Sequence, residues 1–176
     1  MNSMKNGLLF GSFNPIHNGH IQIAAFFLEQ TDLENIWFFV SPQIPLKDDR
    51  TLLDPDHRIE LVNLALESDE HMVCSKIELK LPIPSYTIET LDFIKNKHPD
   101  HTFVIIMGSD NLESLEKWKD YQRILEEHQI YVYPRNGFDG GLFISHPSVR
   151  LFSSRFLEVS ASELRKKIRQ GITDKW

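Results

Sequence analysis

The stretch of sequence that decides the fold is Gly11-Ser12-Phe13-Asn14-Pro15-Ile16-His17-Asn18-Gly19-His20. It follows a short apolar run, residues 8–10, and precedes a segment, residues 21–28, whose apolar residues have helical spacing. A glycine at the end of a strand lets the backbone approach a ligand closely, and free N–H groups at a helix start attract phosphate. The two histidines add side-chain donors at the same point. The stretch therefore predicts a strand, an anion-binding loop and a helix.

The same alternation continues along the chain. Nearly continuous apolar runs at 36–40, 72–74, 103–107 and 130–133 predict strands buried on both faces. Helical patterns follow Asp54-Pro55, Ser85, Ser109 and Ser160, with Asp54 and Ser109 expected to cap their helices. Strands alternating with helices predict one α/β domain over residues 1–176, a doubly wound parallel sheet of the Rossmann-like kind. Ligands bind such sheets at the carboxyl ends of the strands.

Composition narrows the class of protein. The 176 residues are 41% hydrophobic and 25% charged, which is typical of globular proteins and excludes collagen-like, disordered and disulfide-rich classes. No apolar run is long enough to span a membrane and no signal-peptide core follows Met1, so we expect a cytoplasmic protein. The net charge of −6 argues against nucleic-acid or membrane partners. The single cysteine, Cys74, is expected to be packed rather than reactive.

Two loops are too long to be simple turns. Residues 41–54 carry two prolines and Lys47, and residues 134–148 carry Asn136-Gly137 and Gly140-Gly141. Loops of this length are either rims of an active site or ordinary surface excursions. We expect both to border the site.

His17 and His20 are the candidate catalytic residues. Two donors beside a helix N-terminus suit a reaction that stabilises a charged phosphorus centre without a covalent nucleophile. Histidines three residues apart can also bind a metal ion, but no third ligand is evident among the other histidines, so no protein metal site is expected. The remaining alternative is a pair of incidental polar loop residues.

These residues resemble a known family. The stretch 11–20 resembles the signature of the HxGH nucleotidylyltransferases, and the other motifs are similar to those of bacterial nicotinate-nucleotide adenylyltransferases. Five stretches match in order: residues 11–20, Ser41-Pro42 to Lys47, Pro84-Ser85-Tyr86-Thr87, Gly108-Ser109-Asp110-Asn111 with Trp118-Lys119, and Val159-Ser160-Ala161-Ser162-Glu163-Leu164-Arg165.

The resemblance implies transfer of AMP from ATP to nicotinate mononucleotide, with magnesium, giving deamido-NAD and pyrophosphate. It implies catalytic roles for His17 and His20. The ATP-binding residues that it implies are Gly11, Ser12, Phe13, His17, His20, Gly108, Asp110, Ser160, Ser162 and Arg165. The mononucleotide-binding residues that it implies are Asn14, Lys47, Ser85, Tyr86, Thr87, Trp118 and Arg135.

Physical chemistry supports several of these roles and leaves alternatives. Asp110 can accept a hydrogen bond from a ribose hydroxyl or cap a helix. Trp118 can stack on a pyridine ring or belong to the core. Ser160, Ser162 and Arg165 can converge on phosphates or form an ordinary N-cap with a basic helix.

The chain departs from the family in one motif, since Ser160-Ala161-Ser162 stands where relatives usually have Ser-Ser-Thr. Other HxGH adenylyltransferases, acting on phosphopantetheine or nicotinamide mononucleotide, are the alternative functions, as is a noncatalytic nucleotide sensor. A homo-oligomer is left open.

Overall fold

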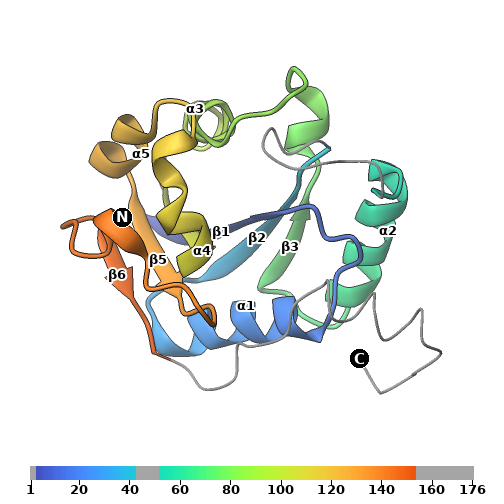
Figure 1. Cartoon of the computed structure of the whole chain (residues 1–176). Helices are drawn as coiled ribbons and strands as arrows, with labels where there is room; N and C mark the ends of the chain where they lie inside the picture. The colour runs from blue at the N-terminus through green and yellow to red at the C-terminus, as the bar shows by residue number, and fades with distance from the viewer. Residues whose placement is uncertain (1–2, 43–51, 154–176) are drawn as a thin grey trace.

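The computed structural model describes residues 3–42 and 52–153, and Figure 1 shows their helices on both faces of a central sheet. All neighbouring strands of the sheet run parallel. Across the sheet the order is β3 (Met72–Ser75), β2 (Asn35–Val40), β1 (Met4–Gly11), β4 (His101–Gly108), β5 (Gln129–Tyr133) and β6 (Val149–Leu151). The predicted doubly wound parallel sheet is confirmed.

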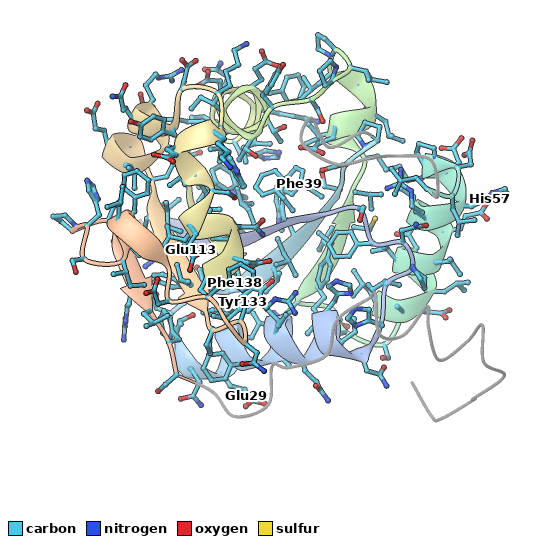
Figure 2. The ribbon with its side chains drawn as sticks, in the orientation of Figure 1. Glu29, Phe39, His57, Glu113, Tyr133 and Phe138 are labelled. Atoms are coloured by element: carbon cyan, nitrogen blue, oxygen red, sulfur yellow. The ribbon has the colours of Figure 1, made fainter. Side chains whose placement is uncertain are left out.

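Strands β1, β2, β4 and β5 supply side chains alternately to two cores. On one face, Leu9, Phe38 and Ile106 pack with α1 (Asn18–Gln30) and α2 (Pro55–Leu66). On the other face, Leu8 and Ile105 pack with helices that include α3 (Thr87–Lys97) and α5 (Tyr121–Glu127). Figure 2 shows Phe39 in this second interior. Because both faces are covered, the strands carry continuous apolar runs, as predicted.

The predicted helix cap is right at α2 and wrong at α4 (Ser109–Glu113), although a helix is present at both places. Asp54 caps α2 by accepting the Asp56 N–H at 2.9 Å, with Pro55 as the first helical residue. Ser109 does not cap α4, because Gly108 is the N-cap and Ser109 is the first helical residue. The Ser109 hydroxyl instead donates to the Phe138 carbonyl at 3.0 Å and accepts the Arg135 N–H at 2.8 Å.

Several elements were not predicted. Strand β6 and helix α5 are short, and so are the 3₁₀ helices η1 (Ile77–Lys80), η2 (Leu115–Lys117) and η3 (Gly141–Phe143). Within the part of the chain that is described, no helix is long and apolar enough to cross a membrane. The Cys74 side chain packs against the first core, and burial raises the pKa of its thiol to about 11, so it stays protonated at neutral pH.

Gly7 lies in β1 where the side chains of the core leave little room. A Cβ added there would lie 2.6 Å from Ile36, 2.7 Å from Ile106 and 2.9 Å from Leu33. We expect Gly7→Val to lower the free energy of unfolding by about 1–3 kcal/mol, because extra carbon atoms overpack a filled core. Urea denaturation at neutral pH measures the change. An unchanged midpoint would mean that the core can expand at this point.

Candidate active site

The order in which the chain adds strands to the sheet reverses direction at the neighbouring strands β1 and β4. From β1 the chain continues toward β2 and β3, and it then crosses back to β4 on the other side of β1. The connections that leave β1 and β4 therefore diverge, which makes their carboxyl ends the expected ligand crevice of such a sheet. The predicted stretch 11–20 follows β1, and Gly108 to Asp110 follow β4. The fold brings these two motifs to the same edge.

His17 and His20 form a stacked pair at the start of α1. Their ring centroids lie 3.8 Å apart with an angle of 29° between the planes. His17 is the N-cap of α1, and its backbone N–H donates to Nδ1 of His20 at 3.2 Å. Because Nδ1 of His20 accepts this bond, the hydrogen of the neutral ring belongs on Nε2. No acidic residue lies in the first turn of α1 to neutralise its positive dipole end.

The surroundings of His20 keep its ring uncharged. Burial, followed by electrostatic repulsion from His17 and Arg135, lowers the pKa of His20 to about 3. The ring therefore offers a neutral Nε2–H donor at neutral pH. A neutral donor of this kind stabilises charge that develops on a reacting phosphoryl group without moving a proton.

We expect His20 to remain neutral in the folded free protein as the pH falls from 7 to 4. The unfolded chain protonates this ring near its ordinary pKa of 6.5, so it binds more protons than the folded chain below that pH. The contribution of His20 to stability is therefore complete above pH 6.5 and declines toward pH 3. A ¹⁵N NMR titration of the ring, assigned with His20→Gln, measures this. Protonation near pH 6.5 in the folded protein would contradict it.

The Phe13 ring packs against the ring of His20. Its side chain is only 2% exposed and its ring meets that of His20 edge-on, with centroids 5.0 Å apart. A Cβ on Gly11 would lie 3.1 Å from the Phe13 ring, so the glycine leaves room for this packing. The Phe13 side chain thus belongs to the core, so only its backbone could make the predicted contact with a nucleotide.

The end of β4 supplies a carboxylate. Asp110 follows Gly108 in the first turn of α4, and its Oδ1 atom is buried without a hydrogen-bond partner among the described residues. A Cβ on Gly108 would lie within 3 Å of both the Asp110 carboxylate and the Arg135 side chain. A buried oxygen without a partner is costly unless a ligand satisfies it. The Asp110 carboxylate is therefore suited to accept a hydrogen bond from a ligand hydroxyl.

Arg135 follows β5 and brings a positive charge to the same region. Its guanidinium lies over the Tyr133 ring, 5.3 Å from the centroid, and its charge contributes to the low pKa of His20. The connection that carries it is fastened to α4, because Glu113 Oε1 accepts the N–H groups of Asp139 and Gly140 at 2.8 and 3.2 Å. Figure 2 shows Glu113 and Phe138 on this side of the molecule.

The predicted pyridine-binding residues come from the second face of the sheet. Tyr86 is the N-cap of α3, its side chain makes no cap hydrogen bond, and Thr87 is the first residue of the helix. Tyr86 and Trp118 are both half-buried against the second core. Lys119 joins their two segments by lying over the Tyr86 ring, 4.8 Å from its centroid, and by pairing with Glu89. The turn at Tyr86 and the segment that carries Trp118 therefore lie next to each other in the structure.

Two predicted residues are occupied by contacts within the protein. The buried Ser85 hydroxyl donates to Glu78 at 3.5 Å, and the Asn14 side-chain oxygen accepts the Leu53 N–H at 3.1 Å. Ser12, by contrast, is half-buried in the loop after β1. The predicted residues Lys47, Ser160, Ser162 and Arg165, and the helix expected after Ser160, lie outside the described residues.

Sequence reasoning missed two buried charged residues near the site, Arg58 on α2 and Glu78 in η1. Glu78 is 2% exposed and accepts the Thr90 hydroxyl at 3.0 Å in addition to the Ser85 hydroxyl. Burial raises the pKa of its carboxyl despite hydrogen bonds from Ser41, Thr90 and Ser85. Glu78 lies between Ile77 and Leu79 in a stretch where charged and apolar residues alternate, and this pattern offered no signal that its carboxylate is buried.

Comparison with known proteins identifies the class. Residues 8–167 match the cytidylyltransferase-like family. A solved structure, the nicotinic acid mononucleotide adenylyltransferase of Plasmodium falciparum complexed with NaAD, superposes with a TM-score of 0.79 over 96% of this chain and 88% of that chain. At 19% identity this likeness shows the fold alone. The protein is a nucleotidyltransferase on a Rossmann-like fold.

Relatives at higher identity narrow the class further. A probable nicotinate-nucleotide adenylyltransferase of Flavobacterium psychrophilum is 47% identical over 94% of this chain and 87% of the relative. A protein of the same description from Bacteroides fragilis is 38% identical over 97% of this chain and 85% of the relative. The chain belongs to the nicotinate-nucleotide adenylyltransferase family.

Proposed function

We propose that this enzyme transfers AMP from ATP to nicotinate mononucleotide, forming deamido-NAD and pyrophosphate in NAD biosynthesis. A phosphate oxygen of the mononucleotide forms a bond to the α-phosphorus of ATP, and the bond from that phosphorus to the bridging oxygen breaks, so that pyrophosphate leaves with the electron pair. The protein must hold two anions in line and stabilise the charge of a third as it leaves. Positioning and electrostatics supply most of the catalysis.

The observation that carries this proposal is the His17–His20 pair at the N-terminus of α1. The Nε2–H of neutral His20 would donate to the phosphoryl group, while the dipole of α1 and the charge of Arg135 would attract the phosphates. Asp110 would accept a ribose hydroxyl of the nucleotide through its buried Oδ1.

The residues proposed for the acceptor lie on the opposite face. The N–H groups at the start of α3, at Thr87 and Ile88, would bind the nicotinate carboxylate, and Trp118 would stack on the ring. Lys47, Ser160, Ser162 and Arg165 complete the proposal as phosphate contacts by resemblance alone.

Magnesium would enter this site on the phosphates of ATP. The described residues contain no group of three His, Cys, Asp or Glu side chains that could hold a metal ion, so they do not build a metal cage. Magnesium commonly keeps its waters and binds substrate phosphates together with one or two carboxylates. MgATP is therefore the substrate form that we propose.

Incubating the purified protein with MgATP and nicotinate mononucleotide, and measuring deamido-NAD and pyrophosphate by chromatography, tests the proposal. Equal amounts of the two products are expected. Parallel reactions with phosphopantetheine and with nicotinamide mononucleotide identify the acceptor. Turnover with phosphopantetheine in place of nicotinate mononucleotide would overturn the proposal, and ATP binding without any product would favour a nucleotide sensor.

A further inference from the structure

Arg58 is a fully buried arginine at the start of α2, with an exposed fraction of 0%. His57, the residue before it, points away from the molecule in Figure 2. The Arg58 guanidinium donates to four backbone carbonyls. Nε reaches Leu53 at 2.9 Å, one terminal nitrogen reaches Ser12 at 2.6 Å and Ser41 at 2.8 Å, and the other reaches Pro42 at 3.3 Å.

These carbonyls belong to three separate segments around the crevice. Ser12 lies directly after β1 in the loop that leads to the histidines, Ser41 and Pro42 follow β2, and Leu53 precedes α2. Only a planar fork with several N–H groups satisfies carbonyls that converge from different directions. Arg58 thus fastens the ends of two neighbouring strands to the start of one helix.

The Ser12 carbonyl is the contact that leads to the catalytic pair. The next residue, Phe13, has φ +43°, a left-handed conformation that is unfavourable for a bulky side chain. Such a conformation persists only where the surroundings hold it on several sides. Arg58 holds the peptide before Phe13, while Gly11 and His20 pack against its ring.

We propose that Arg58 is a positioning residue that holds His20 in its catalytic orientation by fixing the Ser12 carbonyl and the strained backbone of Phe13. The chain of contacts runs from the guanidinium to the Ser12 carbonyl, through Phe13, to the His20 ring. Arg58 touches no substrate in this scheme. The catalytic consequence rests on the proposed function, whereas the effect on the His20 ring does not.

The test compares Arg58→Lys and Arg58→Met with the control Asn6→Ala. Lysine keeps the charge without the fork, and methionine keeps the length without the charge. Asn6 is also 0% exposed and bonded, to Met4, Asn35 and His101, but it lies at the opposite end of β1. Each variant is assayed at a temperature where circular dichroism shows it to be folded.

We expect both Arg58 variants to lower kcat by about 10²-fold, the size of effect that a small misplacement of a catalytic group produces, with little change in the KM for nicotinate mononucleotide. The ¹⁵N resonances of the His20 ring should shift in both. The control should lose stability but keep kcat and the His20 resonances. Wild-type kcat and unchanged His20 resonances in a folded Arg58 variant would overturn the proposal, as would an equal loss of kcat in the control.

Two further measurements keep the test decisive. If the wild-type protein makes no deamido-NAD, the proposed function fails, and the His20 resonances alone decide the role of Arg58. If neither variant folds, the wild-type protein is studied in urea below its unfolding transition. There the Arg58 N–H signals and the His20 ring signals should change together. Loss of the Arg58 signals with the His20 signals unchanged would overturn the proposal.

Discussion

Replacing His20 with alanine should lower kcat by about 10²–10³-fold while the protein stays folded. The loss of one preorganised donor to transition-state charge typically costs about 3–4 kcal/mol. His20 is held for this role by the His17 N–H on one nitrogen and by its edge-on contact with the Phe13 ring, so its Nε2–H needs no reorganisation during the reaction. Steady-state kinetics with saturating MgATP and nicotinate mononucleotide measures the effect.

His20→Gln is the matched variant for this prediction, because its amide nitrogen can donate a hydrogen bond from nearly the position of Nε2. It should retain more activity than His20→Ala. Near-ultraviolet circular dichroism checks that both variants keep their tertiary structure. A folded His20→Ala protein with wild-type kcat would remove His20 from the mechanism.

The enzyme should also prefer nicotinate mononucleotide over nicotinamide mononucleotide by at least about 10²-fold in kcat/KM. At the start of α3 the Tyr86 side chain makes no cap hydrogen bond, so backbone N–H groups are the donors that we propose this turn presents. A carboxylate accepts from such donors, whereas the NH₂ of the amide is itself a donor and opposes them. Polar groups left opposed in a binding site allow discrimination that an apolar pocket cannot achieve between two acceptors of equal shape.

Thr87→Pro tests the origin of this preference, because it removes one N–H at the first position of α3, where proline is tolerated. Tyr86 already has the extended conformation that a following proline requires, with φ −113° and ψ 139°. The ratio of acid to amide kcat/KM should fall in this variant. Thr87→Ala keeps the N–H and should keep the ratio. Equal use of both mononucleotides by the wild-type enzyme would refute acid specificity.

The strands could be expected from sequence because buried parallel strands carry continuous apolar runs, and five of the six were recognisable. Strand β6 was not, because two of its three residues, Arg150 and Leu151, are exposed and it pairs with β5 alone. Helix α5 was not predicted for a related reason. It buries only Ile124 and Leu125, and the rest of it is polar, so no apolar stripe stands out.

The site was predictable where one local motif carries it and unpredictable where distant segments meet. His17 and His20 are three residues apart on one helix turn, so their pairing follows from spacing. Arg58 looks from sequence like a charged residue on the solvated face of an amphipathic helix. Its burial depends on four carbonyls from three segments, and no sequence pattern announces such a convergence.

The two faces of the sheet divide the labour of this enzyme in a way that bears on how its relatives diverge. The histidines stand on α1, which belongs to the first core, whereas Tyr86, Thr87 and Trp118 stand on segments packed in the second. Both groups reach the carboxyl edge of the sheet, where we propose that donor and acceptor meet. On these proposed roles, substitutions in the segments of Tyr86 and Trp118 would change the acceptor without disturbing the histidines on α1, provided that Asp110 on α4 is retained. A gene duplicate in this family could thus acquire a new acceptor through the second layer while it keeps the histidines and the carboxylate that we propose for the nucleotidyl donor.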